Sequence, residues 1–180
     1  DMLVLEYALD TFYYQDAMSK LKTAESDDAR ILKNILVTEI DINNIKTVLR
    51  SVRDRIDIDE AKRYFVQGSP DFDTEKLLSM MKAGTIEGVL KQLEHTPYQF
   101  IAKIPPEYIA AEKISAFEKE LERYLVKKAV GQFMGDPLSI AIPIAYIWAK
   151  FTEVTNIRVI ARCKVTEVPE KELREALISV

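Results

Sequence analysis

Apolar residues recur at helical spacing along most of this 180-residue chain. Residues 2–22 contain no Gly or Pro, and their apolar positions predict a first helix. A longer helix is predicted over residues 27–55, where apolar residues recur at steps of three, four and seven. Ser26 is its predicted N-cap, and Asp27 and Asp28 suit the positive end of the helix in the first turn.

The pattern continues to the C-terminal end as further helices. One is predicted to have Asp57 or Asp59 as its N-cap and to end at the breaker Gly68-Ser69-Pro70. Two short helices follow, separated at Gly84, and Pro105-Pro106 is the best candidate linker. The remaining helices are predicted over residues 108–133, 136–164 and 168–179. No strand pattern stands out, so the predicted fold class is all-α.

Residues 136–164 include the longest apolar stretch, "LSIAIPIAYIWA" at residues 138–149. It is shorter than the roughly 20 residues of a membrane span, and it predicts a buried core helix with Trp148 as an anchor. Asp136 is its predicted cap and Pro137 its first residue, with Pro143 either early in the helix or kinking it. The N-terminal residues do not have the pattern of a signal peptide. Because position 1 is not Met, we expect the chain to be part of a longer protein.

One pattern of charged and apolar residues occurs twice. "IDINNIKTVLR" at residues 40–50 and "TEVTNIRVIAR" at residues 152–162 match without a gap at an offset of 112, as do positions on either side of them. This period exceeds the 20–50 residues of solenoid repeats, so each copy is predicted to be a small helical domain. We place these domains at residues 1–104 and 105–180.

The charged residues of the motif point to different sides of their helix. At about 100° per residue, Asp41 and Ile45 share one face, whereas Lys46 and Arg50 share another. The Asn in each copy can hydrogen-bond the next helix, and the Arg can pair across a helix interface. Alternatively, because the basic positions recur, some of them face a partner protein. The candidate interface or interdomain residues are Asp41, Asn44, Lys46, Arg50, Glu153, Asn156, Arg158 and Arg162.

The amino-acid composition does not point to a specific chemical activity. The net charge of −4 gives no general attraction to nucleic acid, and a single cysteine, Cys163, leaves no intrachain disulfide or cysteine metal cluster. His95 is the only histidine and is expected at the surface or at a helix cap. The glycines are scattered and form no phosphate-binding loop. We therefore expect no catalytic residues, no cofactor and no metal.

With the paired motif, "LEYALDTFYY" and the run from Asp136 through "KELREALI", the chain resembles the C subunits of archaeal-type (A/V-type) rotary ATP synthases. The eukaryotic relative of that family is the d subunit of the vacuolar proton pump. Members carry three related helical domains of long antiparallel helices in a pseudo-threefold funnel. The resemblance implies that this chain is roughly their second half and holds two of those domains.

The resemblance also implies a mechanical, non-catalytic role. The family connects the rotating proteolipid ring to the central-axle subunits, as a peripheral part of the complex on the cytoplasmic face of the membrane, without a membrane span of its own. Two other interpretations remain open: a generic all-α scaffold or adaptor, and an all-α enzyme with a metal bound at Asp27 and Asp28. The sequence does not indicate whether the coupled ion is a proton or sodium.

Overall fold

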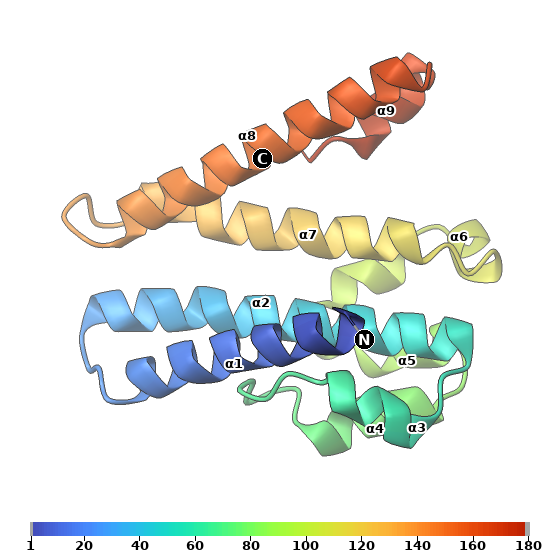
Figure 1. Ribbon diagram of the computed structural model, residues 1–180, viewed down its shortest axis with the longest axis horizontal. Coiled ribbons are helices and arrows are strands. Elements are labelled where there is room, and N and C mark those ends of the chain that lie inside the picture. Colours follow the sequence, from blue (N-terminus) through green and yellow to red (C-terminus); the bar gives the residue numbers. More distant parts are fainter. Residues whose placement is uncertain (1, 179–180) are drawn as a thin grey trace. The chain divides into compact units, whose positions relative to one another are not determined.

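The computed structural model describes residues 2–178, and the side chains of residues 2–4 and 6 lie outside what it describes. α-Helices and short 3-10 helices are the only regular elements in this part of the chain, which confirms the all-α prediction. Figure 1 shows their succession. The first elements are α1 (Met2–Lys22), α2 (Asp27–Asp54), α3 (Ile58–Ala61), η1 (Lys62–Tyr64), α4 (Thr74–Lys82) and α5 (Ile86–Gln92). The later ones are η2 (Gln99–Lys103), α6 (Pro106–Ala110), α7 (Ile114–Val130), η3 (Gly131–Met134), α8 (Ala141–Val165) and α9 (Glu170–Ala176).

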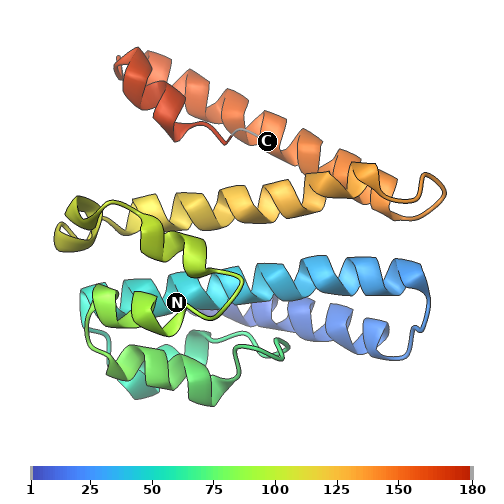
Figure 2. The same ribbon diagram turned by 180° about the vertical axis from the view of Figure 1, so that it is seen from behind.

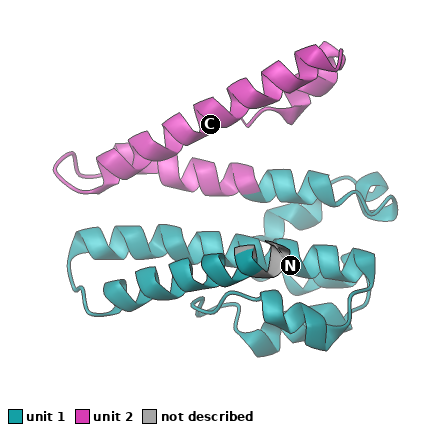
Figure 3. Ribbon diagram, viewed as in Figure 1, with its two compact units in different colours: residues 1–121 teal, residues 122–180 magenta. Residues whose placement is uncertain are grey.

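The chain divides into two compact units, residues 1–121 and residues 122–180 (Figure 3). The border lies inside α7, whose first two turns belong to unit 1. This division rests on spatial contacts, whereas the predicted domains 1–104 and 105–180 rest on the sequence repeat. The repeat-based domains remain a prediction.

In unit 1, α2 is the central helix. One side of it packs against α1 through a buried cluster of Tyr14, Leu36, Ile40 and Val66. α2 also contacts α4 and α5, which supply Leu77, Met80, Val89 and Leu90 to the core. Figure 2 shows α4 and α5 from behind. Buried apolar surface contributes about 25 cal/mol per Å², so this double coverage stabilises α2 along most of its length.

The start of α2 follows the predicted capping chemistry. The Ser26 hydroxyl accepts a hydrogen bond from the Ala29 amide at 3.1 Å, and Asp27 and Asp28 lie in the first turn. Asp27 pairs with Arg30 one turn further along. The predicted position of both acidic residues in the first turn is confirmed.

Two glycines with positive φ lie between helical segments. Gly84 separates α4 from α5 with φ of 68°, a left-handed conformation that favours glycine. Gly68 has φ of 135°, and a Cβ atom there would approach Ile40 Cδ1 to 3.2 Å. The helix predicted to run up to Gly68 is shorter than expected, however. α3 begins after the N-cap Asp57 and, with η1, ends at Tyr64, because Phe65 adopts an extended conformation.

The helix predicted over residues 108–133 is wrong at both ends. It is interrupted between α6 and α7, where Glu112 takes a left-handed conformation with φ of 48°. The Lys113 and Glu112 amides donate to the Tyr108 and Ile109 carbonyl groups, so the exposed carbonyls at the end of α6 are satisfied without a continuing helix. After Val130 the chain tightens into the 3-10 helix η3.

The start of α8 also differs from the prediction. Asp136 is not its N-cap and Pro137 is not its first residue, because α8 begins at Ala141. Asp136 instead closes a turn by accepting hydrogen bonds from the Leu138 amide and the Ser139 hydroxyl. Pro143 is therefore the third helical residue, where a missing N–H removes no bond within the helix.

The prediction of a buried core helix over residues 138–149 is wrong. In unit 2, α8 contacts η3 and α9, and its buried residues are Ala141, Ala145 and Thr152. Leu138, Tyr146 and Ile147 are exposed, and Trp148 is half-buried. The apolar character of these residues therefore does not indicate that they are buried.

Candidate functional site

Asn44 fastens an extended segment to the middle of α2. Its side chain is fully buried, its Nδ2 donates to the Val66 carbonyl at 2.8 Å, and its Oδ1 accepts from the Val66 amide at 2.8 Å. The amide side chain thus satisfies both polar groups of a backbone unit that is removed from water. Leaving such groups unpaired would cost about 1–3 kcal/mol each.

Asn156 makes the same pair of bonds in the second copy of the motif. Its Nδ2 donates to the Ile178 carbonyl at 2.7 Å, and its Oδ1 accepts from the Ile178 amide at 3.0 Å. Both partners, like both asparagines, are separated by the repeat offset of 112. Each Asn was predicted to bond the next helix, but its partner lies in a non-helical segment that follows a short helix. The repeat extends to the geometry of this contact.

The acidic positions of the motif differ between the copies. Asp41 is buried on α2, and its Oδ2 accepts a hydrogen bond from the Tyr98 hydroxyl at 2.7 Å. Glu153 is exposed on α8 and pairs with Lys150 at 2.6 Å. The first acid therefore helps to hold the segment after α5 onto α2, whereas the second forms a pair within its own helix.

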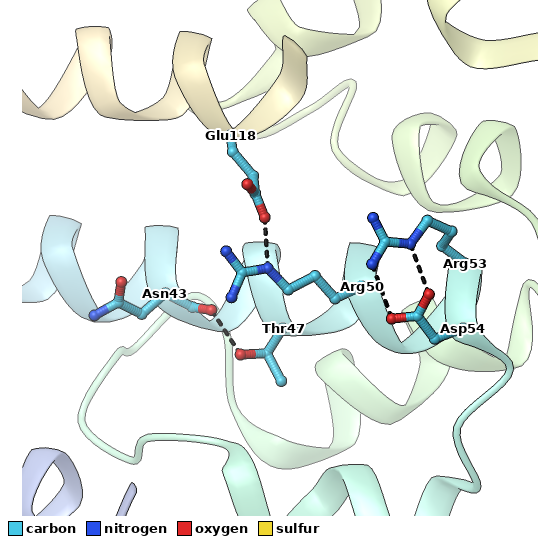
Figure 4. A network of polar contacts seen from close by, with 6 residues as sticks. All are labelled: Asn43, Thr47, Arg50, Arg53, Asp54 and Glu118. Atoms are coloured by element: carbon cyan, nitrogen blue, oxygen red, sulfur yellow. Dashed lines mark hydrogen bonds and ion pairs between the residues drawn. The ribbon is translucent and has the colours of Figure 1, made fainter. Parts of the chain in front are cut away.

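Arg50 joins α2 to the start of α7. Its Nε donates to Glu118 Oε1 at 2.5 Å, as Figure 4 shows, and both residues belong to unit 1. The hydrogen bond to Glu118 is the main cause that raises the pKa of Arg50, which therefore stays fully charged. The Arg50 side chain remains about half exposed, so the pair is partly screened by water.

The other basic candidates lie closer to solvent. Lys46 is half-buried on α2, and Arg158 and Arg162 are exposed on α8. In the described part of the chain, the bonds of Asp41, Asn44 and Arg50 reach three different segments, at residues 98, 66 and 118. The residues of the motif therefore make separate contacts along one helix and do not meet at a single site. The role of its basic residues at an interface remains a prediction.

A polar network between α1 and α2 was not predicted from the sequence. The Tyr14 hydroxyl accepts from Asn43 Nδ2 at 2.7 Å and also hydrogen-bonds Glu39. Burial is the main cause that raises the pKa of both Glu39 and Tyr14. Asn43 lies inside the quoted motif, but the second copy has Thr155 at the corresponding position. Comparison of the two copies therefore did not single out Asn43.

The described residues contain no group of three or more His, Cys, Asp or Glu side chains arranged to hold a metal ion. His95 is exposed at the surface, as predicted. Among the helices of the described region, none combines the length and the apolar character needed to cross a membrane. The polar contacts of this region hold helices and segments together, and they are the features on which a functional interpretation can be built.

Comparison with known proteins connects this arrangement to one family. Residues 1–176 match the family model described as ATP synthase (C/AC39) subunit. The chain belongs to this family. The family resemblance expected from the paired motif is therefore confirmed.

Individual relatives agree with the family match. The chain is 29% identical to the C subunit of the A-type ATP synthase of Methanosphaera stadtmanae, over 98% of this chain and 46% of that protein. It is 31% identical to the C subunit of the A-type ATP synthase of Methanocaldococcus jannaschii, over 100% of this chain and 45% of that protein. The chain spans about half the length of these curated relatives. No solved structure gives a significant match.

Proposed function

We propose that this chain forms part of a non-catalytic subunit that couples the membrane proteolipid ring of a rotary A-type ATPase to its central axle. The observation that carries the proposal is the family match over residues 1–176, together with relatives that are named as C subunits of A-type ATP synthases. As part of that complex, the chain would act as a peripheral component on the cytoplasmic face of the membrane. It would require no cofactor.

The mechanical properties of the fold support this role. α2 contains 28 residues and α8 contains 25, which correspond to lengths of about 42 and 38 Å at 1.5 Å per residue. Because protein cores are close-packed and have low compressibility, the covered helix α2 can transmit strain along its length. The Asn44 and Asn156 contacts fasten neighbouring segments to these helices and resist sliding.

A coupling subunit transmits torque and performs no chemistry of its own. Its loss should therefore separate ATP hydrolysis from ion movement without abolishing hydrolysis. We expect an A-type ATPase reconstituted without the full-length subunit to hydrolyse ATP and to show no ATP-driven ion pumping. Adding the full-length subunit back should restore pumping. Pumping at the normal rate without the subunit, or its absence from complexes purified from membranes, would contradict the proposal and favour a separate adaptor role.

The recurring basic positions provide a more local test. We propose that Arg158 contacts a partner in the assembled complex, because it is exposed and repeats the basic position of Lys46. Arg158→Glu in the full-length subunit should weaken capture of the proteolipid ring in a pull-down assay. Lys171→Glu, the same charge change at an exposed residue of α9, serves as the matched control. Equal capture by both variants would assign Arg158 to the fold alone.

A further inference from the structure

The connection between α7 and α8, residues 131–140, carries the two most exposed large apolar side chains among the described residues. Met134 is 92% exposed and Leu138 is 95% exposed. Phe133, next to Met134, is 41% exposed. Figure 3 shows this α7–α8 loop within unit 2, where it joins the end of α7 to the start of α8. Exposed apolar side chains that gather at one place indicate a contact surface more than scattered ones do.

Hydrogen bonds within the α7–α8 loop hold its backbone in place. The Gly135 amide donates to the Gln132 carbonyl at 2.9 Å. The Leu138 amide donates to Asp136 Oδ1 at 2.9 Å, and the Ser139 hydroxyl donates to the Asp136 carbonyl at 2.8 Å. These bonds order the loop without burial of its apolar side chains. The exposure of Leu138 is therefore compatible with a defined loop conformation.

The repeat indicates that the fold itself does not require apolar residues in this loop. At the offset of 112, Met134 and Leu138 correspond to Lys22 and Ser26, which lie in the connection between α1 and α2. Both of these residues are polar, although the two connections join equivalent helices of the two copies. A requirement of the helix pair would apply to both copies. The apolar side chains of the second loop therefore point to a role other than folding.

The charges near the two connections differ as well. Lys127 and Lys128 lie in the last turn of α7, directly before η3, and Lys127 is exposed. Residues 127–142 contain two lysines and one aspartate, whereas the equivalent residues 15–30 contain four acidic and three basic residues. The second connection therefore combines exposed apolar side chains with a small excess of positive charge.

We propose that the α7–α8 loop binds the surface of a lipid bilayer, with Met134 and Leu138 entering the boundary between the headgroups and the acyl chains. A bilayer presents an apolar layer directly beneath anionic headgroups. This order matches apolar side chains in the loop and lysines set back from them on α7. Such binding is favoured by the apolar area placed in the boundary and by the attraction of basic residues to anionic lipid. Lipid alone provides the binding surface, so the contact is separate from the proposed coupling role.

The test is flotation of the full-length subunit with vesicles that contain no other protein. Vesicles of phosphatidylcholine with about one-third phosphatidylglycerol should bind the subunit, and vesicles of phosphatidylcholine alone should bind it about fivefold less. Raising the salt concentration should weaken binding to the anionic vesicles. Absence of binding to the anionic vesicles would overturn the proposal. That result would not affect the coupling role, which is measured by ion pumping.

Two serine variants separate the α7–α8 loop from apolar exposure in general. Val165, the last residue of α8, is 84% exposed and serves as the matched control for Leu138. Leu138→Ser should lower binding to the anionic vesicles by about fivefold or more, and Val165→Ser by less than about twofold. Because both residues are exposed, circular dichroism should show unchanged helix content. Equal effects, or no effect of Leu138→Ser, would overturn the proposal; the latter is the result expected if another part of the full-length subunit covers the loop.

A charge reversal tests the contribution of the lysines. Lys127→Glu should weaken binding to the anionic vesicles by about fivefold and leave binding to the phosphatidylcholine vesicles unchanged. Lys171→Glu makes the same charge change at an exposed residue of α9 and should weaken binding by less than about twofold. Equal losses in the two variants would show that net charge controls binding, which would overturn the role of the α7–α8 loop.

Discussion

At the scale of single residues, the two motif asparagines show how one side chain can hold a chain segment in place. Asn44 and Asn156 each donate to a carbonyl and accept from the amide of one residue 22 positions later. They differ in burial, since Asn44 is fully buried and Asn156 only partly. Water can replace lost bonds only where it can enter, so the same substitution should have unequal effects at the two sites.

We expect Asn44→Ala to lower the free energy of unfolding by about 2–3 kcal/mol, because it leaves the Val66 amide and carbonyl without partners away from water. Asn156→Ala should cost about 1 kcal/mol, because Ile178 is closer to solvent. Urea unfolding measured side by side tests the difference. Equal losses in the two variants would contradict the role assigned to burial.

Glu39 provides a prediction of pH dependence. Burial raises the pKa of its carboxyl above the ordinary value of 4.5, so the folded state binds this proton more tightly than the unfolded chain does. The protonated Glu39 carboxyl therefore contributes its full stabilisation below pH 4.5. This stabilisation is lost as the pH rises through the pKa of Glu39 in the folded state. We expect Glu39→Gln to remove this loss and to be more stable than the natural chain at pH 7.

The measurement is the free energy of unfolding between pH 4 and pH 8, compared between the natural chain and the variant. The advantage of Glu39→Gln should grow with pH. Glu25→Gln makes the same chemical change at an exposed residue before α2 and is the control. An advantage that is constant with pH would indicate that the effect comes from altered packing and not from the carboxyl group.

At the scale of elements, the two long helices start at different repeat positions although their sequences align. α2 begins at Asp27 behind the Ser26 cap, whereas α8 begins at Ala141, two positions later in the repeat. The turn closed by Asp136 precedes α8. As a result, Pro143 lies in the first turn of α8, whereas Ile31, its repeat counterpart, lies beyond the first turn of α2.

A proline exchange tests this difference. We expect Ile31→Pro to cost about 3 kcal/mol or more, since it removes a hydrogen bond within α2 and its ring clashes with the preceding turn. Pro143→Ala should change stability by less than about 1 kcal/mol, because no helical bond is gained there. Ile31→Ala serves as the control for the lost side chain. The measurement is thermal unfolding of the three variants. A large gain in stability on Pro143→Ala would place the start of α8 earlier, because Pro143 would then lie in the helix interior.

At the scale of the whole molecule, the repeat and the compact units divide the chain differently. α7 belongs to the second copy, yet its first two turns belong to unit 1 with α2. The Arg50–Glu118 pair and the burial of Phe117 and Leu121 account for this overlap. The second copy therefore supplies the first two turns of α7 to the compact unit formed by the first copy.

The strength of that joint can be measured by a double-mutant cycle. Arg50→Ala, Glu118→Ala and the double variant should give a coupling energy of about 0.5–1 kcal/mol, because the Arg50 side chain is half exposed. High salt should reduce the coupling. Chemical denaturation at two salt concentrations provides the values. Zero coupling at low salt would indicate that apolar burial alone holds the start of α7 in unit 1.

Much of this architecture could be predicted from local patterns. The first two helices, the Ser26 cap and the break at Gly84 follow from periodicity and capping, which act over a few neighbouring residues. The repeat and the family resemblance depend on the order of residues along the chain, so they could also be recognised in the sequence. The break at Glu112 was missed, because a left-handed Glu has no clear local signal.

The sequence by itself determined the helical class, the two copies of the motif and the family to which they point, because helix-forming periodicity and residue order are properties of the chain alone. Only the tertiary structure decided which apolar faces are covered. Ile35 and Ile147 occupy the same repeat position in long helices, but one is buried and the other exposed. The difference arises because burial depends on which segments pack against a helix, and α2 is contacted by α1, α4 and α5 within unit 1.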